Sequence, residues 1–241
     1  MKKQVKIVGF SEDSLKFLKL AGKQKNSDWI VKNDSKYQNL IRLPLLNLAD
    51  SIKKELSPKA RNYHFPFKGI GRIKRPAHKI EPGGAHYKDW ISYIATRPSM
   101  SRFEKNPVLF FGLLPNEVEW GGGVVVAGGL YMTSSVQMRR VRQAIADDAE
   151  PFKELFADKE FKKSFKDNFN KMTQAQKCPR GFDPNHSEME WIKLKTFFVS
   201  KKLSMKELSS PQFNRNLARD FTQLLRLNDL LQSAIDGNWS A

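Results

Sequence analysis

Two neighbouring apolar runs near the middle of the chain constrain the fold more than any other feature. The segment NPVLFFGLLPNEVEWGGGVVVAGGLYM holds runs over 108–114 and 118–126 that are rich in β-branched and aromatic residues. The residues PNE between the runs are typical of a turn, and the glycines at 121–123 indicate a bulge or a close backbone approach. We therefore predict a central antiparallel β segment.

Helical patterns precede this segment. Ser11 is a natural N-cap, acidic residues follow it, and Gly22 is a suitable end, so a helix is predicted over 11–22. A second helical stripe follows, which Pro44 should kink and Pro58 should stop. These patterns predict a helical N-terminal region.

Helical patterns also dominate the part of the chain that follows the β segment. A helix is predicted behind a Ser134/Ser135 cap, and the last helix is predicted to begin at Ser210, with Pro211 in its first turn. The phenylalanines at 161, 165 and 169 recur every four residues, which is typical of a core stripe. The fold class is therefore α+β in one domain, 1–241: N-terminal helices, a central antiparallel sheet and C-terminal helices.

The region 60–102 lacks helical periodicity and is rich in Pro and Gly, so we expect irregular structure and short strands there. Its stretch ARNYHFPFKGIGRIKRPAHK contains six Lys or Arg residues and no acid, interleaved with Tyr63, Phe65 and Phe67. Basic groups that neutralise phosphates, beside aromatics that stack on bases, suit single-strand binding. The alternative is that the aromatics are buried and the charges form a solvated rim.

The net charge of +17 indicates the sign of the partners. Such an excess attracts nucleic acid, anionic membrane surfaces, acidic proteins or phosphorylated metabolites, although solubility alone also explains it. The longest apolar runs are too short for a membrane span, and the N-terminus does not resemble a signal peptide. With Cys178 as the only cysteine, we expect a cytoplasmic protein without disulfides.

The stretch CPRGFDPNHSEMEWIKLKTFF is readable as a helix start or as a chemical site. Asp183 before a proline, and Ser187 with Glu190, are both candidate N-caps. In the functional interpretation, Arg180, Asp183 and His186 line a cleft where Asp and His form a general-base pair or bind an anion.

Metal and nucleophile sites are not predicted. The spacings of His64, His78 and His86 fit no standard metal motif. Cys178 lacks a nucleophile signature, and no G-x-S-x-G elbow, phosphate loop or dinucleotide fingerprint occurs. No cofactor is predicted either.

The order P-R-G-F-D-x-x-H followed by L-x-K-x-F-F resembles a widespread bacterial family, the domain of unknown function 2461. The opening FLKLAGKQKNSDWIVKNDSKYQNLIRLPLLNLADSI is similar to that family's beginning, with Trp29, Tyr37 and Pro44 in matching places. The segment LFFGLLPNEVEWGGGVVVA followed by MRRVRQAI looks like its central hairpin and next helix. The resemblance covers nearly the whole chain, and it implies no particular reaction because none is established for the family.

One departure from the family is clear. The family pattern R-x-x-R-D-x-R-F-x-x-x-[DN]-K-x-x-Y corresponds here to RIKRPAHKIEPGGAHY, in which Arg72, Arg75 and Tyr87 match and most other polar members are replaced. If that pattern carries chemistry, this chain is altered or inactive. If it carries structure, the packing is solved differently.

The leading interpretation is an uncharacterised protein that binds a polyanion or nucleic acid through a basic segment near 61–87. Arg72 and Arg75 would contact phosphates, Arg180 would contribute if the fold brings it near, and Tyr87 would orient the ligand or stack on it.

Two alternatives remain at this point. One is an enzyme that acts on a phosphorylated or anionic small molecule, with Asp183 and His186 as acid–base groups and the arginines as a substrate clamp. The other is a scaffold protein without ligand. A deep pocket that joins these residues would favour the enzyme, and a broad basic face would favour nucleic acid. The sequence leaves the oligomeric state open.

Overall fold

The centre of the molecule is a four-stranded antiparallel sheet. The structure is a computed structural model, and it describes residues 9–99, 104–116, 122–131, 133–171 and 174–239. The strands follow the chain order β1-β2-β3-β4, so each strand pairs with its sequence neighbour. Helices precede and follow the sheet, which confirms the α+β prediction. The strands are β1 Ile91–Thr96, β2 Val108–Leu114, β3 Gly123–Leu130 and β4 Phe197–Leu203.

The two central strands meet the prediction differently. β2 spans the predicted run, whereas β3 begins later than predicted and continues to Leu130. Gly122 and Gly123 have φ angles of 63° and 87°, a left-handed conformation that a regular strand does not use. Regular pairing therefore begins only at Gly123, which faces Leu114. Residues 117–121, including part of the predicted turn, lie outside the described residues.

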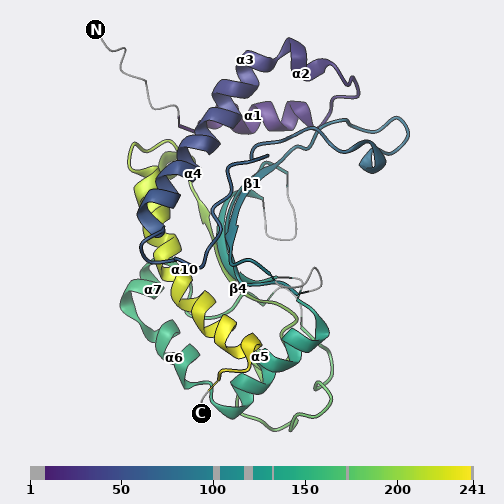
Figure 1. Cartoon of the computed structure of the whole chain (residues 1–241). Coiled ribbons are helices and arrows are strands. Elements are labelled where there is room, and N and C mark those ends of the chain that lie inside the picture. The colour runs from purple at the N-terminus through teal and green to yellow at the C-terminus, as the bar shows by residue number, and fades with distance from the viewer. Residues whose placement is uncertain (1–8, 100–103, 117–121, 132, 172–173, 240–241) are drawn as a thin grey trace.

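Helices lie against one face of the sheet and near its two ends (Figure 1). α4 and α10 run along one face of the curved sheet, α1 to α3 lie near one end, and α5 to α7 lie near the other. The helices are α1 Glu12–Ala21, α2 Trp29–Lys32, α3 Asp34–Tyr37, α4 Leu43–Leu56, α5 Ser135–Asp147, α6 Glu150–Ala157, α7 Lys159–Ser164, α8 Met189–Ile192, α9 Met205–Leu208 and α10 Phe213–Asp236.

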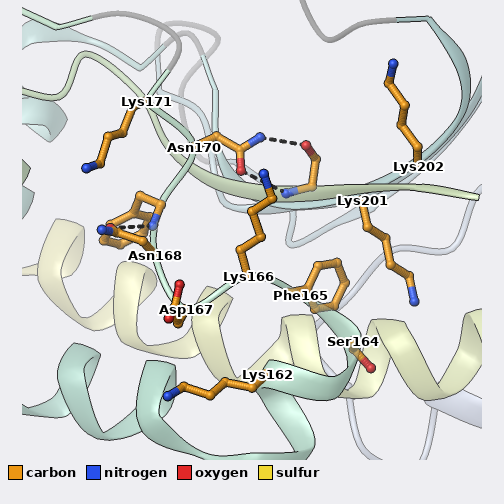
Figure 2. Close-up of a pocket in the computed structure, with 12 residues that line it drawn as sticks. Lys162, Ser164, Phe165, Lys166, Asp167, Asn168, Asn170, Lys171, Lys201 and Lys202 are labelled. Carbon is orange, nitrogen blue, oxygen red and sulfur yellow. Dashed lines mark hydrogen bonds between the residues drawn. The ribbon is translucent and has the colours of Figure 1, made fainter.

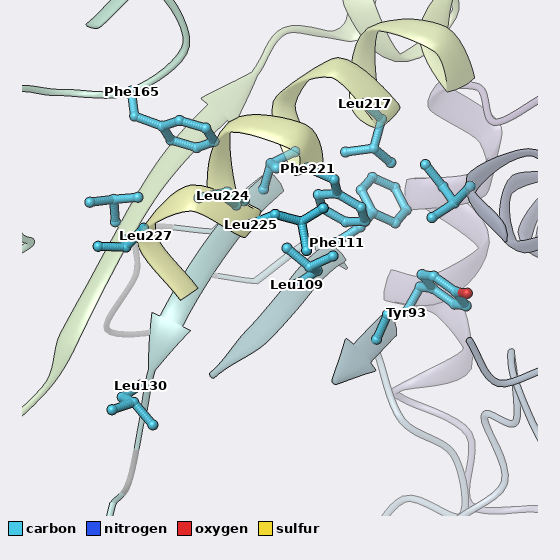
Figure 3. Packing of buried hydrophobic residues seen from close by; sticks show 14 of the residues in the cluster. Tyr93, Leu109, Phe111, Leu130, Phe165, Leu217, Phe221, Leu224, Leu225 and Leu227 are labelled. Atoms are coloured by element: carbon cyan, nitrogen blue, oxygen red, sulfur yellow. The ribbon is translucent and has the colours of Figure 1, made fainter. Parts of the chain in front are cut away.

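The main core lies between α10 and the convex face of the sheet (Figure 3). Tyr93 and Phe111 point from the strands toward Phe221 of α10, and all three are fully buried. A Cβ atom at Gly128 of β3 would lie 2.8 Å from Leu224, so glycine permits the close approach of helix and strand. The continuity of this core supports the proposal that 1–241 forms one domain.

The N-terminal helices follow the predicted pattern with one added irregularity. α1 begins after Ser11 and ends before Gly22. The second stripe is divided into α2, α3, a π-helical turn over Gln38–Arg42 and α4. Pro44 is the second residue of α4, and the carbonyl of Leu40, four residues before it, accepts from Ser14 Oγ at 2.8 Å. The helix is irregular at the π-helical turn directly before this proline, and it continues through the proline without a break.

The phenylalanine stripe is buried but does not belong to one helix. α7 ends at Ser164, so only Phe161 is helical, while Phe165 and Phe169 lie in the following loop. All three are buried in the main core, as expected. The last helix also starts later than predicted, at Phe213, with Gln212 rather than Ser210 as its cap residue.

A candidate ligand-binding groove on the open face of the sheet

The sheet has a second face that α4 and α10 do not cover, and two adjoining hollows lie there. Alternation along the strands places Ile94 of β1 and Phe110 of β2 on this open face. The two hollows share Trp90, Ser92 and Ile94, so they adjoin one another, and we call the two together the groove.

The first hollow, which we call the basic pocket, has a volume of about 590 Å³ and lies between the segment 66–79 and the start of β1. None of its described lining residues is acidic. Six of them are basic: Lys68, Arg72, Lys74, Arg75, Lys79 and Lys88. Positive charges that converge without a carboxylate produce a local field that favours an anion.

The segment that carries these charges is held by backbone pairing rather than by regular structure. Arg75 N–H donates to the carbonyl of His86 at 2.9 Å, and Lys88 N–H donates to the carbonyl of Ile73 at 2.8 Å. Gly71, with a φ of 73°, lets the chain turn where Tyr37 Oη donates to its carbonyl at 3.1 Å. The backbone of the pocket is therefore fixed while most of its basic side chains reach solvent.

Tyr87 is an anchor of this segment and not a stacking surface. Its side chain is fully buried, its hydroxyl donates to the carbonyl of Ser27 at 2.6 Å, and it accepts from Ile30 N–H at 3.2 Å. Its ring packs against Trp29. The expected stacking role is therefore wrong for Tyr87, because no part of its ring is available to a ligand.

Arg72 and Arg75 line the same pocket, as the sequence suggested, but they differ in freedom. Arg75 is half-buried, and its Nε donates to the carbonyl of Tyr87 at 3.1 Å. Arg72 is exposed. Arg72 is thus the more adaptable of the two, whereas Arg75 also braces the backbone.

The pKa of Lys88 reflects the repulsion between the positive charges in the basic pocket. Burial lowers the pKa of Lys88 below its ordinary value, and the nearby charges of Arg75 and Arg72 lower it further. Its Nζ lies 4.4 Å from the centre of the Trp90 ring, a cation–π contact. An anion in the pocket would relieve this repulsion between like charges.

The second hollow, which we call the aromatic hollow, has a volume of about 990 Å³ and extends from β1 to β4 across the open face. Its apolar lining is aromatic at several positions: Trp90, Phe110, Tyr131 and Phe198, together with Ile94. Trp90 and Ile94 are the most accessible of these, at 38% and 41% exposure. Tyr131 and Phe198 meet edge to face, with ring centroids 5.8 Å apart.

Glycine shapes this hollow by leaving room above the sheet. A Cβ atom at Gly112 would lie 2.8 Å from the Phe110 ring, so that ring lies over the glycine. Gly129 has a φ of 122°, and a Cβ there would lie 2.3 Å from the carbonyl of Phe197. Larger residues at these positions would displace the ring or the strand backbone.

Arg97, which lines the far end of the aromatic hollow, belongs to a partly exposed polar cluster. Arg97 Nη2 donates to Asp229 Oδ1 at 2.5 Å, and the guanidinium lies 5.6 Å from the Tyr63 ring centre. Burial raises the pKa of Tyr63 to about 12. Burial also raises the pKa of Asp229, while Arg97 opposes that rise. The ion pair links the residue that follows β1 to α10.

Asp183, His186 and Arg180 lie elsewhere, in the loop before α8. This loop contacts α5 and α6: His186 Nε2 donates to the carbonyl of Ala146 at 3.1 Å, and Glu188 pairs with Lys153 at 2.7 Å. The segment that lines the basic pocket instead contacts the N-terminal helical region, at the opposite end of the molecule (Figure 1). The fold therefore does not join the two sets of predicted residues.

The loop uses its polar side chains for its own turns. Asp183 Oδ1 accepts from Asn185 N–H at 2.9 Å, which is an Asx turn. His186 Nδ1 accepts from Glu188 N–H at 3.0 Å while Nε2 donates, so both ring nitrogens are engaged. Neither Asp183 nor Ser187 caps α8. The cap residue of this helix is Glu188, and its N–H donates to His186 Nδ1. Arg180 is exposed.

The other residues considered from the sequence are the histidines and Cys178. No group of three or more His, Cys, Asp and Glu residues there is placed to hold a metal. Cys178 Sγ lies 3.4 Å from the carbonyls of Pro179 and Phe182. None of the described helices combines the length and the apolar character that a membrane crossing requires.

Sequence reasoning missed Lys88 and the aromatic hollow. Trp90, Phe110 and Phe198 come from three separate segments, and only the strand register brings them to one face. The alternation of apolar residues in β2 was the available signal, because Phe110 and Phe111 must point to opposite faces.

The comparisons with known proteins place this architecture in a family. No curated protein and no solved structure matches the chain. The model of the family described as "Conserved hypothetical protein (DUF2461)" matches residues 13–230, which include the basic pocket, the whole sheet and most of α10. The chain therefore belongs to this family of conserved hypothetical proteins, the domain of unknown function 2461.

Proposed function

We propose that the protein binds single-stranded nucleic acid in the groove formed by the basic pocket and the aromatic hollow. The observation that carries this proposal is the sharing of Trp90, Ser92 and Ile94 by a pocket lined with cations and a hollow lined with aromatics. A backbone phosphate and its attached base need such neighbouring surfaces, because the phosphate seeks cations and the base seeks a ring to stack on.

Unpaired bases fit this surface better than a duplex does. The aromatic rings lie on a concave sheet face, and stacking on them requires that a base leaves its own partner. The segments around the hollow offer no long helix to enter a major groove, since β strands and irregular segments line it. We therefore expect a preference for single strands over duplexes.

A second candidate is a small anionic molecule with a planar apolar part. The hollow volumes fall in the range of small-molecule sites, and Lys88 over Trp90 places a cation beside a ring. An enzyme that uses Asp183 and His186 on such a molecule is not supported, because neither residue lines the groove and their loop contacts α5 and α6 through His186 and Glu188. Under the third alternative, a scaffold, neither kind of ligand binds.

The test is fluorescence anisotropy with short single- and double-stranded DNA and RNA across a salt series. We compare wild type with Arg72→Gln/Lys79→Gln, two exposed members of the basic pocket. Arg75 is left unchanged because it supports the Tyr87 backbone. The matched control is Lys32→Gln/Lys36→Gln, which removes two exposed charges that do not line the groove.

For single strands the slope of log affinity against log salt is about 0.7 per phosphate contact, so the double variant should flatten the slope by about 1.4. The control should leave the slope unchanged. Absence of binding to every oligonucleotide at low salt would refute the proposal and favour a screen of phosphorylated metabolites. An equal loss of affinity in Arg72→Gln/Lys79→Gln and in the control would show that binding depends on the net charge of the protein and not on the basic pocket.

A further inference from the structure

A second cluster of cations lies at the opposite edge of the sheet, beside β4 (Figure 2). It surrounds a hollow of about 1160 Å³ between the loop after α7 and β4. We call it the lysine cluster: Lys162, Lys166, Lys171, Lys201 and Lys202. Asp167 is the acidic residue among its described lining residues.

Two of these lysines are already neutralised by carboxylates. Lys171 pairs with Glu190, and Lys201 pairs with the buried Asp220 at 2.7 Å. Within the described chain, neither Lys162 nor Lys166 has a carboxylate within ion-pairing distance, and both are exposed. The cluster therefore keeps positive charge that the protein itself does not neutralise.

The loop that carries Lys166 is fixed to the strand edge. Asn170 N–H donates to the carbonyl of Phe198 at 2.9 Å, and its Nδ2 donates to Ser200 Oγ at 2.6 Å. Ser200 N–H returns a bond to Asn170 Oδ1 at 3.3 Å. Figure 2 shows Lys166 reaching toward β4 beside Asn170. The lysine is thus presented at a defined place on the edge of the sheet.

The lysine cluster adjoins the aromatic hollow through the alternation of β4. Phe198, Ser200 and Lys202 occupy alternate positions and so share one face, and Phe198 lines the aromatic hollow. Figure 2 shows Lys201 and Lys202 pointing to different sides of the strand. Lys202 therefore continues, at the β4 edge, the open face that begins with the basic pocket at β1.

We infer that a single strand of nucleic acid crosses the sheet from β1 to β4, with its backbone held by the basic pocket at one edge and by the lysine cluster at the other. Neighbouring strands lie about 4.8 Å apart, so the four strands span about 14 Å, which leaves room for only a few stacked bases between the two cation clusters. This inference rests on the proposed function and adds a second contact site and a direction to it.

An alternative explanation of the lysine cluster is that its charges protect the edge strand β4 from pairing with another chain. β4 ends the sheet, and lysines at such edges oppose pairing with another chain. That role needs charge on the strand itself, at Lys201 and Lys202. It does not require Lys162 on α7 or Lys166 in the following loop, and these two residues therefore separate the explanations.

The experiment compares wild type with Lys162→Gln/Lys166→Gln, using single strands of about four and about sixteen nucleotides, the limits of known site sizes for one small domain. The matched control is Lys159→Gln/Lys163→Gln, which removes two exposed lysines of α7 that do not line the cluster. Lys162→Arg/Lys166→Arg retains both charges and should bind like wild type. Thermal unfolding verifies that each variant is folded.

We expect Lys162→Gln/Lys166→Gln to weaken binding of the long strand and to flatten its salt slope by about 1.4. Binding of the short strand should change less, because it can occupy the basic pocket without reaching β4. If Arg72→Gln/Lys79→Gln weakens binding while the Lys162/Lys166 variant matches the control, the crossing path is wrong and the proposed function stands. If wild type binds no strand, both are wrong.

Discussion

The hydroxyl of Tyr87 donates to the carbonyl of Ser27 at 2.6 Å and thereby ties the basic segment to the N-terminal helices. The same oxygen accepts from Ile30 N–H, so one buried atom satisfies two backbone groups. Tyr87 therefore has a structural role in this chain. The residue supports the basic pocket from behind rather than lining it.

Replacing Tyr87 by Phe should destabilise the protein and loosen the pocket. The change removes one oxygen and leaves two backbone groups without their partner, which costs about 1–3 kcal/mol in free energy of unfolding. Urea unfolding measures this loss. Tyr37→Phe is the control, since its hydroxyl makes one bond, to Gly71, at a half-buried position, and it should cost less. Equal stability of Tyr87→Phe and wild type would contradict the anchoring role.

Trp90→Ala should weaken binding of single strands without changing the salt slope. The ring lies where the basic pocket meets the aromatic hollow and is 38% exposed. Stacking of one base on such a ring contributes about 1–3 kcal/mol, so the dissociation constant should rise about 5- to 150-fold. Anisotropy titrations at fixed salt measure it.

Two control variants make the Trp90 result specific. Trp90→Phe keeps a ring and should retain most of the affinity. Phe67→Ala removes an exposed ring that does not line either hollow and should have no effect on binding. A loss of affinity in Phe67→Ala as large as that in Trp90→Ala would contradict a stacking site at Trp90.

Lys88 offers a direct readout of anion binding. In the free protein its pKa lies below the ordinary 10.5, because of burial and the charges of Arg75 and Arg72. A bound phosphate opposes those charges and raises this pKa, so binding takes up a proton at alkaline pH. Affinity should therefore fall as pH rises through the free-state pKa of Lys88, where its positive charge is lost.

NMR titration of the lysine side chains, with Lys88→Met to assign the signal, measures this pKa with and without a saturating oligonucleotide. We expect an upward shift of the Lys88 pKa on binding, because Lys88 lines the basic pocket. An unchanged Lys88 pKa at saturation would show that the ligand does not enter the basic pocket.

The sequence predicted the parts of this fold and site that depend on local pattern. The acid-free run around Arg72 was visible in composition, and it does line a pocket. The aromatic hollow was not predictable, because Trp90, Phe110 and Phe198 become neighbours only through strand register. Local spacing carries no information about such long-range pairing.

The Asp183–His186 hypothesis rested on a short spacing, and the structure shows that both side chains make local hydrogen bonds in their loop. Short polar side chains in turns accept from nearby backbone N–H groups, and this loop uses Asp183 and His186 in that way. The phenylalanines at 161, 165 and 169 are buried in the core as predicted, although only Phe161 belongs to a helix, because burial at regular intervals does not require one continuous helix.

His186→Ala tests which role that residue has. Its ring accepts from Glu188 N–H and donates to the carbonyl of Ala146, which joins the loop before α8 to the end of α5. Removing the ring should lower the free energy of unfolding by about 1–3 kcal/mol, since hydrogen bonds of this kind contribute about 0.5–1.5 kcal/mol each.

Oligonucleotide affinity of His186→Ala should stay at the wild-type value, because the loop does not line the groove. Asp183→Ala is the matched control and should cost less, because its one turn bond is exposed. Lost affinity with unchanged stability would instead return His186 to the binding site and contradict the placement of the ligand on the open face.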